Sequence, residues 1–238
     1  VFSATTEAVE VTIKNGTIEA VKRGIAHAGY NGTTAVQVTL NLASDLTIKS
    51  QNECAVCSYG KAILNTNAKL YSENYYALSG NGSNTAQCKE TIINVLGGEI
   101  TSTNSVALYF PTIDGVLNIS GGTITGTTAL EVRAGTTTIS GGTLTATGEF
   151  AEPTASGNGH TSGGGVALMV SQHTTNDETS VTVSGGTLTG AYAIYEKDVQ
   201  DAVVDGISLT IGENAVLNGL TYSQNCSEAL PTAPEAGE

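Results

Sequence analysis

Short segments in which apolar and polar residues alternate recur along the chain, and each is interrupted by a pair of glycines. Alternation predicts β-strand, because successive side chains of a strand point to opposite faces. The glycine pair predicts a sharp bend, because glycine accepts a positive φ without steric cost. The pattern stands at residues 93–101, 117–125, 137–145 and 181–189, with a degenerate copy at 11–19. The sequence therefore predicts a repeated strand, bend, strand unit.

A second repeat is alanine followed by Val, Leu or Ile, and it gives the period of the fold. Its copies are separated by 20, 22, 30, 22, 38, 26 and 22 residues. A base period of 20 to 22 residues with insertions is typical of one turn of a three-sided solenoid. We predict an all-β fold, a right-handed single-stranded parallel β-helix of about seven to eight such coils. The copies begin at Ala35, Ala55, Ala77, Ala107, Ala129, Ala167, Ala193 and, more weakly, Ala215.

Aligning the repeats predicts three inward columns of aliphatic side chains that fill a long, thin core. The alternative, an antiparallel sandwich, needs turns between adjacent strands but no columns in fixed phase. The first predicted column is Ile13, Val95, Ile119, Ile139 and Val183; the second is Ile18, Ile100, Ile124, Leu144 and Leu188; the third is Val36, Val56, Leu78, Leu108, Leu130, Leu168 and Ile194.

The predicted domain organisation is a cap, a solenoid and a tail. Residues 1–33 are expected to cap the open end of the core with a strand and a short helix or loop, because solenoids need such caps. The β-helix is expected over 34–226, with polar insertions at 147–165 and 171–180. Residues 227–238, rich in Pro and Glu, are predicted to link the rod to a larger surface protein.

Charge and composition exclude several classes of partner. The chain has 238 residues, with nine Lys plus Arg against 22 Asp plus Glu and a net charge of −13. This charge repels phosphate backbones and anionic lipids, so nucleic acid and membrane are not expected as partners. No apolar run approaches the roughly 18 residues of a membrane span. Because the chain begins without Met, we expect that a leader was removed or excluded and that the protein is secreted or on the cell surface.

The motif Ser-Gly-Gly-Thr-(Ile/Leu)-Thr at 120–125, 140–145 and 184–189 resembles the pectin-lyase-like β-helix proteins of bacterial surfaces. That family includes polysaccharide lyases and hydrolases, carbohydrate-binding domains and adhesins. The resemblance implies the fold more than any one activity. Our leading hypothesis is a non-catalytic binding module for a polysaccharide or host glycoprotein, and the alternatives are a lyase or hydrolase of this class and a structural stalk. The oligomeric state is left open.

Alternation about the third column predicts an exposed binding surface. An alanine floor at 107, 129, 167 and 193 would be rimmed by larger side chains and flanked by both insertions, as suits a sugar ring or a protein loop. The alternative is that the exposed tyrosines bind no ligand and are present only because tyrosine favours strand formation. The residues predicted to bind are Tyr109, Glu131, Arg133, Met169 and Tyr195, with His160 and His173 from the insertions.

Catalytic groups do not converge in the sequence. The six Asp, at 45, 114, 177, 198, 201 and 205, include no two at matching positions of adjacent turns, which argues against an enzyme, and we expect no cofactor or metal. The segment 176–178 beside His173 could bind calcium, but such loops are usually only solvated. Threonine rows at 123, 143 and 187 and at 101, 125, 145 and 189 resemble those of ice-binding solenoids, a remote alternative.

Four cysteines, Cys54, Cys57, Cys88 and Cys226, are disulfide candidates with three full pairings. The single Cys-x-x-Cys lacks a second pair, so zinc and thioredoxin-like interpretations are weak. Residues three apart in a strand are about 10 Å apart and cannot bridge each other. We therefore predict that Cys54 or Cys57 bonds Cys88, with Cys226 unpaired or folded back along the rod.

Overall fold

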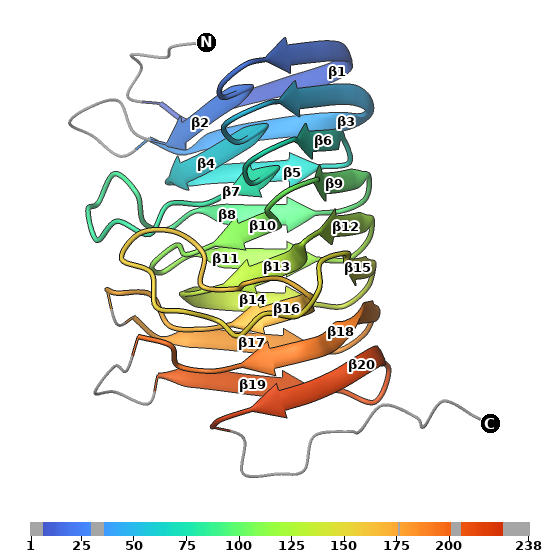
Figure 1. The fold of residues 1–238 in the computed structure, drawn as a ribbon. Helices are drawn as coiled ribbons and strands as arrows, with labels where there is room; N and C mark the ends of the chain where they lie inside the picture. The colour runs from blue at the N-terminus through green and yellow to red at the C-terminus, as the bar shows by residue number, and fades with distance from the viewer. Residues whose placement is uncertain (1–6, 30–35, 176, 201–205, 226–238) are drawn as a thin grey trace.

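The protein is a right-handed parallel β-helix, seen in a computed structural model that describes residues 7–29, 36–175, 177–200 and 206–225 (Figure 1). Its 20 strands form one continuous sheet in which every pairing is parallel, and no helix occurs in these residues. The described part of the chain accordingly contains no helix long and apolar enough to cross a membrane. The predicted fold class is confirmed, and the antiparallel sandwich is excluded.

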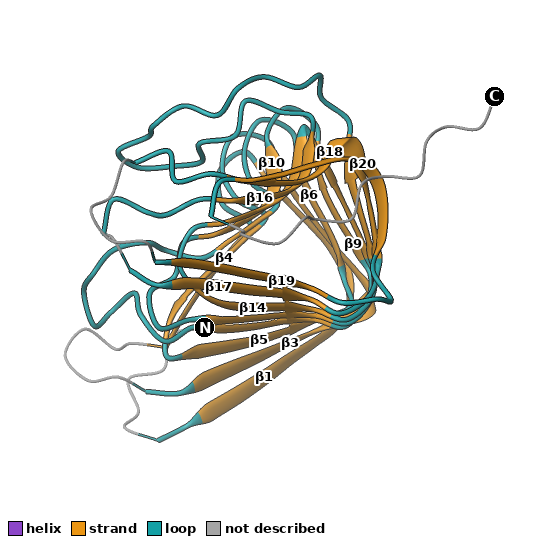
Figure 2. Ribbon diagram, turned by 90° about the horizontal axis from the view of Figure 1, so that it is seen from below, coloured by secondary structure: helices purple, strands orange, loops and turns teal. Residues whose placement is uncertain are grey.

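Viewed along the axis, the coils present three faces, here called A, B and C (Figure 2). Face A comprises the first halves of β1 (Val9–Ala20) and β3 (Val38–Ser50), with β5 (Ala62–Thr66), β8 (Ile92–Val95), β11 (Val116–Ile119), β14 (Gly135–Ile139), β17 (Thr179–Val183) and β19 (Ile207–Ile211). Face B comprises the second halves of β1 and β3, with β6 (Lys69–Ser72), β9 (Glu99–Ser102), β12 (Thr123–Gly126), β15 (Thr143–Ala146) and the first halves of β18 (Thr187–Glu196) and β20 (Val216–Ser223). Face C comprises β2 (Ile25–Gly29), β4 (Val56–Gly60), β7 (Leu78–Ser79), β10 (Val106–Phe110), β13 (Thr128–Val132), β16 (Val166–Val170) and the second halves of β18 and β20.

The predicted columns of aliphatic side chains exist and lie in register. On face A, Val95 pairs with Ile119 and Ile119 with Ile139, and on face B Ile100 pairs with Ile124. These side chains belong to one buried cluster that runs along the rod. One prediction is wrong: Val36 precedes β3, and Ile25 of β2 pairs with Val56 at the head of the third column.

The N-terminal segment is part of the solenoid. β1 pairs with β3 and β2 pairs with β4, so residues 9–29 form the first coil, and the short helix or loop predicted within residues 1–33 is replaced by strand. Strand β2 includes Ile25 to Gly29, within the stretch expected to be a helix or loop. The predicted tail, 227–238, lies outside the described residues.

The glycine pairs form the corner between faces A and B, as predicted. The second glycine of each pair has a positive φ, 78° at Gly98 and 81° at Gly122. A Cβ on Gly98 would lie 2.2 Å from the carbonyl oxygen of Ala68 in the preceding coil. Close approach of successive backbones therefore requires glycine here, in addition to the turn itself.

The repeated alanine occupies the opposite corner, where the chain enters face C. Ala107 and Leu108 both pack in the core, whereas Val106 and Tyr109 belong to a separate cluster outside it. The bend turns two successive side chains inward, and the first must be small. Alanines 107, 129, 167 and 193 are thus core residues, and the prediction that they form an outer floor is wrong.

Candidate functional site

The outer side of face C brings the predicted binding residues together but buries them. The insertion 147–165 leaves β15, crosses face C and returns to β16 (Figure 1, yellow loop). Loops gather along this side of the rod (Figure 2). The insertion and neighbouring loops leave Glu131, Arg133 and Met169 each 0% exposed, Tyr195 4% and Tyr109 5%. These five side chains point away from the aliphatic core, as predicted, but the open binding surface expected from them is absent.

Glu131 and Arg133 hold the insertion against β13. The Glu131 carboxylate accepts hydrogen bonds from the Thr161 amide at 2.7 Å, the Thr161 hydroxyl at 2.9 Å and the Ser162 amide at 3.0 Å. Arg133 donates to the carbonyls of Gly159 and Gln172. Its Nε lies 3.8 Å from Glu131 Oε1. The buried charges are thus paired with each other and bonded to loop backbone, which is the condition for tolerating them.

Stacked tyrosines anchor the middle of the insertion. The rings of Tyr76 and Tyr109 stack with centroids 4.6 Å apart. The Tyr109 hydroxyl donates to the carbonyl of Gly159 at 2.8 Å, and the Tyr76 hydroxyl lies 3.0 Å from Nδ1 of His160. Burial raises the pKa of both tyrosines, so they stay neutral hydrogen-bonding groups. His160 therefore contributes to loop attachment.

Tyr195 and Met169 anchor the start of the same insertion. They cluster with Phe150, and the Tyr195 hydroxyl donates to both carboxylate oxygens of Glu152 at 3.0 and 3.1 Å. Lys197 makes an ion pair with the same carboxylate. Hydrogen bonds from Lys197 and then Tyr195 hold the pKa of Glu152 below its usual value. The side chains that were predicted to bind a ligand thus hold the insertion 147–165 against face C.

His173 packs beside this region, between two loops. Its imidazole Nε2 lies so close to Gly82 that a Cβ there would be 2.8 Å away. Burial, and then the charge of Arg133, lower the pKa of His173 to about 4. The folded protein therefore holds this histidine neutral.

The neutral state of His173 predicts a pH dependence of stability. The unfolded histidine has the ordinary pKa of 6.5 and the folded one about 4, so the unfolded chain binds more protons between these values. The stabilisation is complete above pH 6.5 and is lost as the pH falls to 4. The loss is at most about 1.4 kcal/mol per pH unit, reduced by solvent screening. Urea unfolding across this window measures the slope.

The control for this prediction is His173→Gln, which should flatten most of the slope. His27, whose pKa burial also lowers, accounts for a remaining part. The lowered pKa of Glu152 adds a slope of the same sign at the acidic end of the window, because its unfolded carboxyl has the ordinary value of 4.5. Equal slopes for the variant and the parent protein would contradict a neutral, buried His173.

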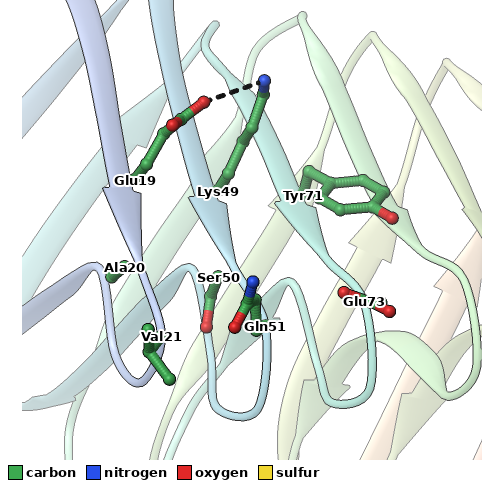
Figure 3. Close-up of a pocket in the computed structure, with 8 residues that line it drawn as sticks. All are labelled: Glu19, Ala20, Val21, Lys49, Ser50, Gln51, Tyr71 and Glu73. Atoms are coloured by element: carbon green, nitrogen blue, oxygen red, sulfur yellow. Dashed lines mark hydrogen bonds and ion pairs between the residues drawn. The ribbon is translucent and has the colours of Figure 1, made fainter.

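A shallow groove lies where face B turns toward face C in the first three coils (Figure 3). The volume of the groove is about 320 Å³. Glu19, Lys49 and Tyr71 project from neighbouring strands, with Glu19 and Lys49 paired at 3.2 Å. The Tyr71 hydroxyl is 2.9 Å from the hydroxyl of Thr103. The lining residues are Glu19, Ala20, Val21, Lys49, Ser50, Gln51, Tyr71 and Glu73.

A row of buried serines, of which Ser50 lines the groove, bonds to the backbone of the bend between faces B and C. Ser50 and Ser72 both donate to the carbonyl of Glu53, at 2.6 and 3.0 Å. Ser102 donates to the carbonyl of Tyr75 at 2.7 Å. These bonds satisfy the backbone of the bend, so the exposed groups on its outer side are presented by a fixed frame.

Sequence reasoning missed this groove, although a signal for it exists. Ser-x-Asn occurs at 50–52, 72–74 and 102–104, each five residues before the alanine of the second repeat. In the structure, Asn104 donates to Asn74 at 3.0 Å and Asn74 to Asn52 at 3.3 Å. The repeated serine and amide mark the corner between faces B and C.

The threonine rows on face B are in register, as expected. Thr123 pairs with Thr143 and Thr143 with Thr187, while Glu99 and Lys69 interrupt the row with an ion pair of 2.7 Å. Within the described ranges, no group of three or more His, Cys, Asp or Glu side chains is placed to hold a metal ion. Asp201 and Asp205 lie outside those ranges.

Comparison with known proteins adds no relative: no protein-family model, no curated protein and no solved structure matches this chain. The resemblance to pectin-lyase-like proteins stays a prediction based on the Ser-Gly-Gly-Thr motif.

Proposed function

We propose that the protein is a non-catalytic module that binds a polysaccharide, or the glycan of a glycoprotein, in the groove of the first three coils. The observation that carries this proposal is the composition and setting of the groove. A tyrosine ring, two carboxylates, an ammonium and an amide line it, and one of the carboxylates pairs with the ammonium. Aromatic rings that stack on sugar faces, beside polar groups that bond hydroxyls, suit a carbohydrate.

The charges of the groove favour a glycan without acidic groups. Glu19 and Glu73 contribute two carboxylates against the single ammonium of Lys49, and the whole chain carries −13. A polymer rich in uronic acid or sulfate would be repelled. The preferred ligand is therefore a neutral polysaccharide, with its chain running over several coils.

The test is a glycan-array screen followed by calorimetry on the glycan that binds. Tyr71→Ala should weaken binding at least about tenfold, which corresponds to about 1.4 kcal/mol. Tyr222→Ala is the matched control, because Tyr222 is also a surface tyrosine, 39% exposed, at the opposite end of the rod. That variant should bind like the parent protein.

Two results would overturn the proposal. If no glycan binds, a structural stalk becomes the better account. If the protein cleaves a glycan, and replacement of Asp177 or His173 abolishes the cleavage, the lyase or hydrolase alternative is correct.

A further inference from the structure

Cys54 and Cys57 lie together on the outer side of face C, at the bend that begins β4. Cys54 precedes the strand and Cys57 is its second residue. The two residues between them, Ala55 and Val56, turn into the core, so both cysteines point outward into one cluster with Tyr76. The estimate of about 10 Å between residues three apart assumes a straight strand and is wrong here, because the chain bends between them.

The two thiols interact directly. They belong to one buried cluster, and the Cys54 thiol lies close enough to the Cys57 sulfur to act as its hydrogen-bond donor. This bond lowers the pKa of Cys57, burial opposes it, and the charge of Arg23 lowers it further. The same bond and burial raise the pKa of Cys54. The Cys57 thiol therefore loses its proton more easily than the Cys54 thiol does. A reactive dithiol needs this difference between its two thiols.

An arginine and a tyrosine lie near the two cysteines. Arg23 is held near the cysteines by an ion pair with Glu53 at 3.3 Å. Tyr75, 40% exposed, lies near the pair: burial raises the pKa of its hydroxyl, and a negative charge on either sulfur would raise it further. Cys54 and Cys57 are themselves buried, at 4% and 8% exposed.

Cys88 does not take part in this arrangement. The structure holds Cys54, Cys57 and Cys88 as free thiols, so the predicted bridge to Cys88 is absent. Cys88 is half-buried and lies outside the cluster that contains the other two. Cys226 lies outside the described residues.

We propose that Cys54 and Cys57 form a reversible dithiol–disulfide site that reacts with small-molecule disulfides. The Cys57 thiolate attacks one sulfur of the reagent, and the other sulfur leaves as a thiol after taking up a proton. Cys54 then loses its proton and attacks Cys57 Sγ, which releases the second half of the reagent as a thiol. One disulfide is consumed, one forms in the protein, and two thiols are produced. This site is independent of the proposed glycan binding.

The experiment uses the full chain with Cys88→Ser and Cys226→Ser, exposed to oxidised glutathione. Alkylation in denaturant and mass spectrometry of the peptide that holds both cysteines follow. We expect a peptide two hydrogens lighter, without alkyl groups and without bound glutathione, that dithiothreitol restores. Recovery of that peptide with both cysteines alkylated would overturn the proposal.

Single variants in the same background assign the two roles. Cys54→Ser should accumulate glutathione on Cys57, because the resolving thiol is missing. Cys57→Ser should react about tenfold more slowly, because the remaining thiol has the raised pKa. Equal rates for the two variants would contradict the proposal. Circular dichroism of each variant confirms that the β-helix is retained, and a glycan-binding assay separates this result from the groove.

Discussion

Replacing Glu131 by alanine is expected to lower the free energy of unfolding by about 3 to 5 kcal/mol. The variant leaves the guanidinium of Arg133, which is 0% exposed, without its counter-charge. It also leaves the Thr161 and Ser162 amides, which donate to Glu131, unpaired. A buried charge without a partner costs far more than the pair itself contributes. Equilibrium unfolding in urea measures the change.

The matched control for that variant is Glu99→Ala. Glu99 also forms an ion pair, with Lys69 at 2.7 Å, but both side chains are more than half exposed. Its loss is expected to cost no more than about 1 kcal/mol. Limited proteolysis adds a second readout, because Glu131→Ala should open the insertion 147–165 to cleavage and Glu99→Ala should not. If the two variants lose equal stability, the buried pair does not hold the insertion.

Replacing Gly98 by alanine is expected to cost about 3 kcal/mol or to prevent folding. The new Cβ would lie 2.2 Å from the Ala68 carbonyl oxygen and 2.3 Å from that of Asn67. Both are backbone atoms of the preceding coil and cannot rotate away. The residue also has a φ of 78°, which adds strain for any side chain.

Two other glycines separate the cost of the close backbone contact from the cost of the positive φ. Gly16 has a φ of 114° but nothing within 4 Å of its Cβ position, so Gly16→Ala isolates the backbone strain and should cost about 1 kcal/mol. Gly157 lies in the insertion with nothing within 4 Å, and Gly157→Ala should change stability by less than about 0.5 kcal/mol. Thermal or urea unfolding ranks the three. A Gly98→Ala cost equal to that of Gly16→Ala would mean that the coils do not approach closely at this corner.

The fold was predictable from the sequence because each coil repeats the same physical problem. Each coil has glycine at one corner and alanine at another, so aliphatic residues such as Ile119 and Ile139 fall at the same position of successive coils. Burying these residues in one core fixes the register between the coils. The error at Val36 has a local cause. The Ala-Val dipeptide at 35–36 matches the repeat, but the first coil carries Ile25 in the equivalent position without a preceding alanine.

The cover over face C was not predictable from alternation. The alternation of inward and outward side chains predicts that Tyr109 and Glu131 point away from the core. It does not predict whether an insertion folds back over them. Glu131 and Arg133 flank Val132 in an otherwise apolar stretch, and this is the one trace of their burial in the sequence. The contact of Cys54 with Cys57 was missed because a bend was treated as a straight strand.

Distances between nitroxide labels on the outer row of face B test the central claim, that successive coils stack in register. The row runs from Thr17 through Lys69 and Glu99 to Val216. Labels are introduced as unnatural amino acids, so the native cysteines remain. With about 4.8 Å per coil, Val216 should lie about 19 Å from Glu99, about 24 Å from Lys69 and about 34 Å from Thr17. Distances that fail to increase in that order would contradict the stacked coils and every surface built on them.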